Sequence, residues 1–466
     1  MPRRLFALVD CANFYASCER IFDPSLEGTP IAVLSNNDGC VIARSEEVKA
    51  AGVPMAAPYF TCRRELERIG ARVFSSNYSL YADMSRRVME TLHTVTPDVE
   101  VYSVDEAFLV IPGPEAGADP GAEHARLGAV ARSIRERVWR WTGVPTRVAI
   151  AETKTLAKAG VTLAKRLQRH GGEPALCFWN HPAREAHLAS MSVRDVWGIS
   201  RRWGRRLEGL GAATVDRLVA LPDPVIRKTL SVVGLRTAYE LRGVACLGLE
   251  HDPPIRRSLI RSRSFRQPIS DLATISEAVA THAARAGEKL RREGLVAGRV
   301  AALVTTKGVG EGPHRTGWLE LPLSTPTNRT PDLIRAAKSS AAQSFEARDF
   351  YGNVYRYRKA GVVCTDLRPA RPVQTQAFVP ARTFDPAWAD GQDRLHAAMD
   401  RLNRRFGRRT VAFAAQGAPR NLRALESETV PEAGGTPAPL PAWGMARDHT
   451  HHAYTTRWES LPVVRA

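Results

Sequence analysis

Three acidic residues have the chemistry that metal-dependent phosphoryl transfer requires. Asp10 ends the apolar run at residues 5–9, and Asp105 and Glu106 lie between two alternating segments at residues 99–111. Such a transfer needs in-line positioning and compensation of charge, which two Mg²⁺ ions roughly 3.5–4 Å apart can supply. Because Mg²⁺ prefers oxygen ligands, including one or two protein carboxylates, the three acids are candidate ligands for a pair of divalent ions.

Each acid taken singly has a simpler structural explanation. Asp10 can cap the helix that follows it, and Asp105 and Glu106 can be turn residues, since Asp is favoured in both settings. A metal site requires the two segments to be neighbours in one sheet, so that their acids converge at its edge.

The predicted elements can bring these segments together. Residues 5–9 read as a buried strand, and residues 100–104 and 107–111 as a tight hairpin around Asp105 and Glu106. A long helix at 123–142, a strand at 146–151 and a helix at 154–168 follow. This order is typical of a split βαβ sheet with helices on one face.

Basic residues are distributed unevenly along the chain. The formal net charge is +18, with 66 Lys and Arg against 48 Asp and Glu. Residues 1–170 are almost balanced, with 22 basic against 20 acidic side chains, whereas residues 256–371 carry 21 against 10. A basic excess of this kind favours a polyanionic partner. We therefore expect the first region to be a catalytic body and the second to grip nucleic acid.

Length and composition restrict the class of protein. A chain of 466 residues predicts three or four domains. No apolar run approaches the roughly 18–20 residues of a transmembrane helix, and the N-terminal apolar stretch is too short for a signal peptide. Seven cysteines without a Cys-x-x-Cys pair argue against a disulfide framework and favour a reducing cytoplasm. His449, His451 and His452 have no cysteines close by, which favours surface polarity over a metal site.

Two motifs around the acids resemble the signatures of the Y-family, lesion-bypass DNA polymerases. They are residues 10–19 (DCANFYASCE) and 102–108 (YSVDEAF). Three further segments agree with this family: 35–45 (SNNDGCVIARS), 75–85 (SSNYSLYADMS) and 149–158 (AIAETKTLAK). Within the family the chain is most similar to the UmuC type, the catalytic subunits of DNA polymerase V. Its ending at 453–458 (AYTTRW) also resembles the UmuC tail.

The resemblance implies an α+β, multi-domain fold shaped like a right hand. A palm built on the split βαβ sheet takes residues 1–22 and 80–170, and small fingers take residues 23–79. A helical thumb of the helix-hairpin-helix type follows at 171–245, and an α/β little finger that binds DNA at 256–371. Residues 372–466 form a linker and the UmuC-type C-terminal region.

The same resemblance assigns metal-binding roles. Asp10 and Asp105 bridge two Mg²⁺ ions, and the backbone carbonyl of Cys11 is a further ligand. Glu106 binds the ion that activates the primer 3′-hydroxyl, so that Asp105 and Glu106 are the catalytic pair.

Two aromatic residues of the first motif are expected to contact the nucleotide. Tyr15 is the steric gate, a flat ring under the sugar that leaves no room for a ribose 2′-hydroxyl, and Phe14 lies beside it in the nucleotide-binding motif. The alternative for Tyr15 is core packing beside Phe14.

Lysines supply the expected contacts to the triphosphate. Only nine residues are Lys, yet Lys154, Lys158 and Lys165 all fall in the predicted helix at 154–168. Lys158 is expected to reach the triphosphate as a point charge. A solvated helix face is the alternative for Lys158 and Lys165. In the fingers, Lys49 and Arg44 are further candidates for contact with the triphosphate, and Lys49 is the preferred one. The alternative for either residue is a plain surface charge.

The chain departs from the family's usual pattern at three places. Ala149 and Ser200 stand where the family usually has Gly, and Ser200 puts phosphate contact by the thumb's hairpin turn in doubt. In the linker, Gln374 and Phe378 occupy the place of a sliding-clamp peptide that lacks its usual aliphatic residues.

The resemblance implies an error-prone, template-directed DNA polymerase for translesion synthesis in the SOS response to DNA damage, without proofreading. Its substrates are primer–template DNA and dNTPs, and its partners are a processed UmuD-type dimer, the RecA filament and the sliding clamp. Two other functions compete with this one. A nucleotidyl cyclase also uses two metals on such a sheet but needs no Arg-rich domain, and a non-catalytic relative has no reason to keep all three acids.

Overall fold

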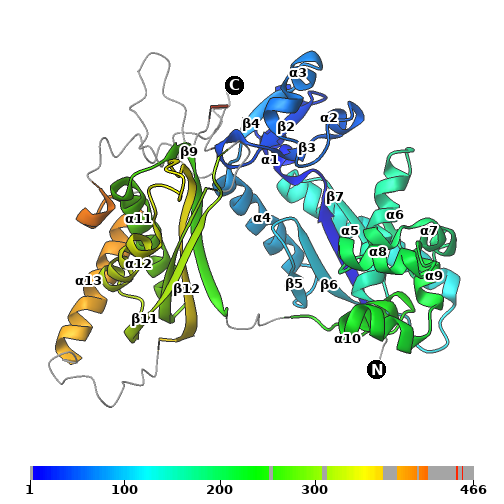
Figure 1. Cartoon of the computed structure of the whole chain (residues 1–466). Coiled ribbons are helices and arrows are strands. Elements are labelled where there is room, and N and C mark those ends of the chain that lie inside the picture. The colour runs from blue at the N-terminus through cyan, green and yellow to red at the C-terminus, as the bar shows by residue number, and fades with distance from the viewer. Residues whose placement is uncertain are drawn as a thin grey trace, which may run out of the picture.

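Three β-sheets organise the described part of the chain (Figure 1). The computed structural model describes residues 4–250, 256–306, 312–370, 386–406, 409–417, 448–449 and 454. The strand orders are β5-β6-β1-β7-β8, β3-β2-β4 and β11-β10-β12-β9. The five-stranded and three-stranded sheets share one apolar core and each contributes to a second, whereas the four-stranded sheet has a core of its own. The multi-domain α+β architecture is therefore confirmed.

The five-stranded sheet has β1 (Arg4–Cys11) at its centre. β6 (Glu106–Pro112) and β7 (Thr146–Ala151) flank β1, and both run antiparallel to it. β5 (Val99–Val101) pairs with β6, and β8 (Ala175–Cys177) runs parallel to β7. Because β8 belongs to this sheet, the sheet extends past residue 170, the expected end of its region.

Helices cover both faces of this sheet, so the prediction that they lie on one face is wrong. On one face, Leu5 and Val9 pack with α4 (Tyr78–His93) and α5 (Pro120–Thr142). On the other face, Leu8 packs with α6 (Lys154–Gln168). The physical reason is that β1 is buried on both sides from Leu5 onward, and an apolar strand of this kind needs cover on each face.

The three-stranded sheet has its own small core and follows helix α1 (Phe14–Ile21). β2 (Ile31–Leu34) lies between β3 (Val41–Arg44) and β4 (Arg72–Ser75). Helices α2 (Glu46–Ala50) and α3 (Tyr59–Arg68) pack on it. The turn predicted at residues 36–39 is confirmed as a 3₁₀ segment, η2 (Asn36–Asp38).

A helical region packs on the α6 face of the five-stranded sheet. It contains α7 (Arg184–Ser190), α8 (Arg201–Gly209), α9 (Val215–Ala220) and α10 (Asp223–Leu241). Ser200 is the N-cap of α8, and its hydroxyl accepts a hydrogen bond from the backbone N–H of Trp203 at 3.2 Å. The serine that departs from the family pattern therefore satisfies one of the free amides at this helix start.

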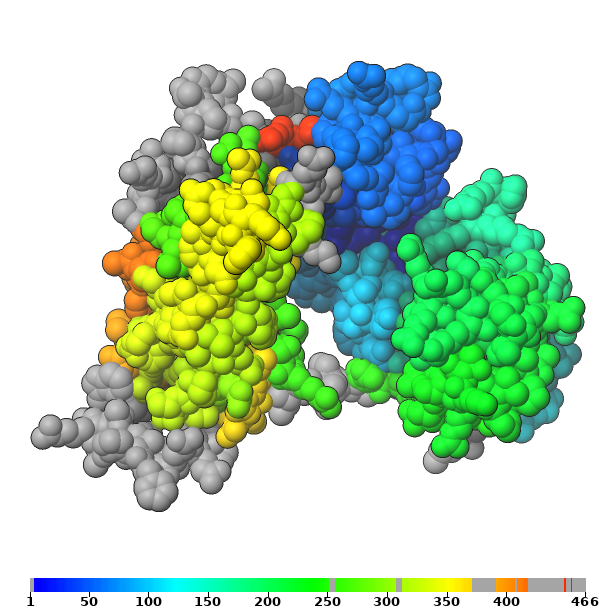
Figure 2. All heavy atoms as spheres, in the orientation of Figure 1, coloured from blue at the N-terminus to red at the C-terminus, as the bar shows by residue number. Residues whose placement is uncertain are grey.

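The four-stranded sheet carries helices on one face. Its strands are β9 (Ser258–Ile269), β10 (Leu295–Thr305), β11 (Thr316–Thr327) and β12 (Tyr357–Pro369). α11 (Leu272–Arg292) and α12 (Thr330–Ser344) form the core with it. In Figure 1 these helices lie on one side and the strands face the rest of the molecule. Figure 2 shows an open cleft between the body built on this sheet and the body built on the five-stranded sheet.

Parts of the C-terminal region pack on the rest of the molecule. α13 (Pro386–Arg405), which the sequence did not predict, is joined to α11 by an Arg291–Asp400 ion pair of 2.8 Å. Farther along, the backbone N–H of Asp448 donates to Asp38 at 2.7 Å, and the Tyr454 ring stacks on Phe22 with centroids 4.7 Å apart. None of the described helices is both long and apolar enough to span a membrane.

Candidate active site at the edge of the five-stranded sheet

The sheet brings the three predicted acids to neighbouring backbone positions. Asp10 on β1 is paired with Glu106, the first residue of β6, in the antiparallel register. The carbonyl of Asp105 accepts a hydrogen bond from the backbone N–H of Cys11 at 2.8 Å. Residues separated by almost one hundred positions in the chain therefore meet at one end of the sheet.

All three acids lie close enough to the Cys11 thiol to affect its pKa. Burial raises its pKa well above the ordinary value, and the negative charges of Asp10, Asp105 and Glu106 raise it further. All three carboxylates thus contribute to the electrostatic potential at one buried atom. The thiol itself stays protonated and is a packing group in the core that covers the α4 and α5 face.

Each carboxylate has its own hydrogen-bonding partner. Asp10 Oδ1 accepts from Lys165 Nζ at 2.9 Å, and both oxygens of Glu106 accept from Lys158 Nζ at 3.0 Å. Asp105 accepts from the hydroxyl of Ser103. Across the residues that the structure describes, no three His, Cys, Asp or Glu side chains gather as a metal-binding group. The oxygen donors are of the type that Mg²⁺ prefers, but here two of the three carboxylates face lysine cations.

The lysines come from one face of α6. Lys154, Lys158 and Lys165 are spaced by four and seven residues, which places them on the same side of a helix. Lys154 is buried and pairs with Glu100, whereas Lys158 and Lys165 lie against Glu106 and Asp10. The alternative of a solvated helix face is therefore wrong for Lys158, whose side chain is 17% exposed.

A buried arginine that the sequence did not single out completes this ring of charges. Arg147 on β7 is paired with Asp10 in the sheet register, and its Nη1 lies 3.7 Å from Asp10 Oδ2. Its Nη2 donates to Glu46 at 3.2 Å. A charged residue within the otherwise apolar strand at 146–151 was the available signal.

Lys49 reaches this network from α2. Its Nζ donates to Glu46 at 3.0 Å and also to the side chain of Asn13. Burial lowers the pKa of the Lys49 ammonium against the opposing effect of Glu46. The Arg44 guanidinium instead donates to the carbonyl of Val53. Of the two basic candidates in residues 23–79, Lys49 is the one that hydrogen-bonds to Glu46, which also accepts from Arg147.

Tyr15 is held in an aromatic cluster beside the acids. Its ring stacks on Tyr81 with centroids 4.2 Å apart and an interplanar angle of 14°, and Tyr78 meets it edge-on at 6.0 Å. Burial raises the pKa of Tyr15 to about 12, with a smaller contribution from Tyr78, so the phenol stays neutral. Phe14 is 3% exposed and its side chain packs in the core beside Tyr15, and its contact to the nucleotide stays a prediction.

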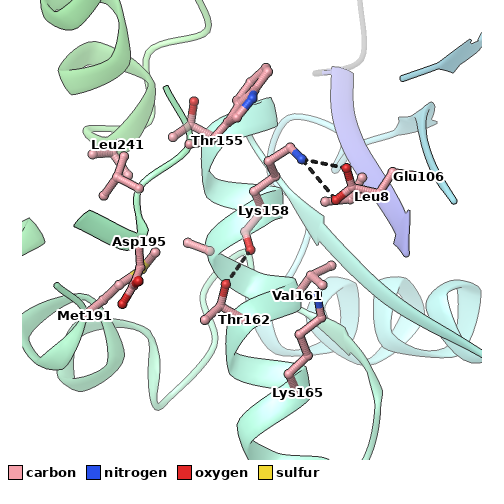
Figure 3. Close-up of a pocket in the computed structure, with 13 residues that line it drawn as sticks. Leu8, Glu106, Thr155, Lys158, Val161, Thr162, Lys165, Met191, Asp195 and Leu241 are labelled. Carbon is pink, nitrogen blue, oxygen red and sulfur yellow. Dashed lines mark hydrogen bonds and ion pairs between the residues drawn. The ribbon is translucent and has the colours of Figure 1, made fainter. Parts of the chain in front are cut away.

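A pocket of about 230 Å³ opens between α6 and the helical region (Figure 3). Lys158 points from α6 toward Glu106 across this space, and Lys165 lies farther along the same helix. The Lys158 ammonium is 4.4 Å from the ring centroid of Tyr102 and 5.3 Å from that of Trp197. Trp197 Nε1 donates to the Tyr102 hydroxyl at 2.9 Å. Sequence reasoning found Lys158 but missed these two rings, which meet only in the folded chain.

Some predicted features lie beyond the described residues. Gln374 and Phe378 of the clamp peptide do, as do His451 and His452. His449 contacts the ring of Tyr59 edge-on, with centroids 5.1 Å apart, and its backbone N–H donates to Ser75 at 3.3 Å. His449 therefore makes specific contacts with two other residues, whereas we expected only a polar side chain on the surface.

Comparison with known proteins identifies the family. Residues 9–161 match the impB/mucB/samB family and residues 256–377 match its C-terminal domain, while residues 393–464 match a domain of unknown function, DUF4113. Protein UmuC of Salmonella typhimurium (strain LT2) is 37% identical over 462 residues, covering 99% of this chain and 100% of the relative. Protein ImpB of Salmonella typhimurium is 36% identical, with the same coverage.

A solved structure shows the fold. A Y-family DNA polymerase chimera aligns over 80% of this chain and all of its own, with a TM-score of 0.60 and 16% identity. The sequence-based resemblance to UmuC-type, Y-family polymerases is thereby confirmed. The chain belongs to the impB/mucB/samB family and has the fold of a Y-family DNA polymerase.

Proposed function

We propose that this protein is an error-prone, template-directed DNA polymerase that performs translesion synthesis in the SOS response to DNA damage. It transfers a nucleotidyl group from a dNTP to a primer 3′-hydroxyl and has no proofreading activity. The observation that carries this proposal is the placement of Asp10, Asp105 and Glu106 at one edge of a sheet in a Y-family polymerase fold.

The sheets fit the parts of a right-hand polymerase. The five-stranded sheet is the palm, the three-stranded sheet the fingers, and the four-stranded sheet the little finger. The helical region is the thumb, although β8, within residues 171–245, belongs to the palm sheet. The open cleft in Figure 2 is the place for primer–template DNA, because the basic body lines one side and the acids lie on the other body.

Asp10, Asp105, Glu106 and the Cys11 carbonyl would hold two Mg²⁺ ions. Bound there, the ions would compensate charge on the triphosphate and on the attacking hydroxyl. The protein's own cations balance the acids in the structure described here: Lys165 and Arg147 at Asp10, and Lys158 at Glu106. Lys158 can exchange this carboxylate for a phosphate oxygen of the incoming nucleotide, as a point charge on a flexible stem.

Tyr15 would select the sugar. Its ring is half-buried and backed by Tyr81, so it cannot withdraw easily to admit a 2′-hydroxyl. Lys49 lies near enough to the same site to reach the triphosphate from the fingers. The gate and the two lysines would thus surround the nucleotide, with Phe14 supporting Tyr15 from the core.

The proposed partners follow from the family and from charge. Exposed arginines on the little finger favour phosphate contacts, so DNA binding should weaken steeply with salt. A processed UmuD-type dimer, the RecA filament and a sliding clamp that binds Gln374 and Phe378 are the protein partners we propose. We propose that the protein acts in the cytoplasm, where its DNA substrate lies.

Primer extension on damaged templates tests this proposal. Purified protein is given Mg²⁺, dNTPs and a primer whose next template position is either an intact base or an abasic site. We expect extension on both templates, with frequent misinsertion, because small fingers check the shape of the nascent pair weakly. Accurate copying of intact DNA together with a complete stop at the abasic site would contradict the proposal.

A further inference from the structure

A buried carboxylic acid lies behind the proposed sugar gate. Glu19 follows Tyr15 by one turn on α1 and is 0% exposed. Its Oε1 accepts a hydrogen bond from the Tyr81 hydroxyl at 2.7 Å. Its Oε2 is buried and has no hydrogen-bonding partner among the described residues. A polar group in such a place costs folding free energy, so stability alone does not explain it.

Tyr81 connects this acid to Tyr15. Tyr81 comes from α4, is 0% exposed, and stacks on Tyr15 at 4.2 Å with rings only 14° from parallel. Its hydroxyl is tethered at the far end by Glu19. A stacked pair can slide with little loss of energy, because dispersion contacts are weak and non-directional. A hydrogen bond is directional, so it limits the positions that the Tyr81 ring can take.

We propose that Glu19 and Tyr81 are positioning residues that fix the plane of the Tyr15 ring and so set the discrimination between deoxyribonucleotides and ribonucleotides. Neither residue touches the nucleotide. Glu19 holds the Tyr81 hydroxyl, Tyr81 presents its face to Tyr15, and Tyr15 meets the sugar. The proposal rests on the gate role given to Tyr15 under the proposed function.

The protonation of Glu19 fits this role. Burial raises the pKa of its carboxyl to about 8, opposed only in part by the Tyr81 hydrogen bond. A neutral carboxyl avoids placing a full charge in an apolar core, yet its oxygen can still accept from Tyr81. The surroundings include Cys18 and Tyr454, whose own pKa values are raised chiefly by burial.

Sugar discrimination is the measurement that tests the proposal. The kcat/KM for single-nucleotide incorporation is measured with one dNTP and the matching rNTP, and the rNTP-to-dNTP ratio is compared among variants. Tyr81→Phe keeps the stacked ring and removes the tether, and Glu19→Leu removes the acceptor. We expect each to raise the ratio about three- to tenfold, the effect of losing one hydrogen bond. Glu19→Gln keeps an acceptor oxygen and should stay closer to wild type than Glu19→Leu.

Tyr357→Phe is the matched control. Tyr357 is also 0% exposed, and its hydroxyl also makes a hydrogen bond, to the Glu346 carbonyl at 3.0 Å, but it lies in the four-stranded body. Loss of a buried tyrosine hydroxyl there should leave the ratio unchanged. Thermal unfolding of every variant is recorded, and if Glu19→Leu does not fold, Tyr81→Phe carries the comparison.

Two results would overturn the proposal, and they differ from a failure of the gate itself. If Tyr81→Phe has the wild-type ratio and Tyr15→Ala has a raised ratio, Tyr15 is the gate but Glu19 and Tyr81 do not position it. Equal losses of kcat/KM for both sugars would mean that Glu19 and Tyr81 are merely structural. An unchanged ratio in Tyr15→Ala would instead show that Tyr15 is not the gate.

Discussion

The five-stranded sheet is covered by helices on both faces, whereas the four-stranded sheet is covered on one. The first holds its charges in pairs: Lys158 with Glu106, Lys165 with Asp10, and Lys154 with Glu100. The second carries Arg266 and Arg299 exposed on its strands, where they form surface ion pairs with Asp448 at 3.6 Å and Glu320 at 3.0 Å. Residues 1–170, which hold four of the five strands of the first sheet, carry a net charge of +2, and residues 256–371, which hold the second, carry +11. Charge pairs held at a largely buried edge suit the chemistry of a site, and a net positive excess on an exposed face suits grip on a polyanion.

Loss of Lys158 should have a large effect on the covered sheet. Lys158→Ala removes the cation nearest Glu106, and we expect kcat/KM for dNTP incorporation to fall about ten- to hundredfold, since hydrogen bonds between charged groups contribute about 1.5–3 kcal/mol. Steady-state primer extension measures it. Lys228→Ala, at an exposed position of α10, is the control and should behave as wild type. Equal kcat/KM values in both variants would contradict a role of Lys158 in nucleotide incorporation.

The close packing of α6 on the sheet can be tested through Gly160. A Cβ added there would lie 2.8 Å from the Ala149 methyl and 2.8 Å from Phe178, so Gly160→Ala should lower the free energy of unfolding by about 1–3 kcal/mol. Thermal unfolding measures it, and Ala149→Gly should restore part of the loss. Gly209→Ala is the control because nothing lies within 4 Å of the added methyl. Equal stability of both variants would contradict the packing described.

The buried acid of the covered sheet predicts a pH dependence. The folded state holds a proton on Glu19 up to about pH 8, whereas an exposed glutamate loses it near pH 4.5. The unfolded chain therefore binds fewer protons in this window, and stability falls as pH rises through it, by at most about 1.4 kcal/mol per pH unit. Glu19→Gln should lose this component. Unfolding at pH 5, 7 and 9 measures it, and identical pH profiles in both proteins would refute the assignment.

The smallest expected effect concerns the open face of the four-stranded sheet. Arg266→Ala/Lys359→Ala should reduce the slope of log affinity for DNA against log salt by up to about 1.8, if both side chains contact phosphates. Arg64→Ala/Arg132→Ala removes two exposed arginines from the rest of the molecule and should keep the wild-type slope. Fluorescence anisotropy at several salt concentrations measures both. A larger decrease of this slope in Arg64→Ala/Arg132→Ala than in Arg266→Ala/Lys359→Ala would contradict the assignment of DNA binding to the four-stranded sheet.

The sequence predicted the elements around the acids well. β7 and α6 have the predicted bounds, Thr146–Ala151 and Lys154–Gln168, because a mostly apolar run and a capped amphipathic helix are strong local signals. Among the strands it missed, β9 is largely exposed and polar, with only Leu259, Phe265 and Ile269 buried. An edge strand of this kind has a weak alternation pattern.

The partners of the acids could not be read from the chain. That Asp10 faces Arg147 depends on the pairing register of β1 and β7, and that Lys165 reaches Asp10 depends on how α6 lies on the sheet. Both are tertiary relations between segments far apart in sequence. Local patterns predicted which acidic residues lie at the edge of the sheet, but the tertiary fold determines which cations pair with them.

The most direct measurement of the central claim is Mg²⁺-dependent primer extension by wild type and by Asp105→Ala/Glu106→Ala. Glu65→Ala/Glu67→Ala removes two acids from α3 instead and serves as the matched control. We expect the first variant to lose at least about a thousandfold in rate, since the two acids carry several kcal/mol of charge compensation, and the control to extend primers as wild type does. Equal extension by Asp105→Ala/Glu106→Ala and wild type would contradict the assignment of these carboxylates as the catalytic centre.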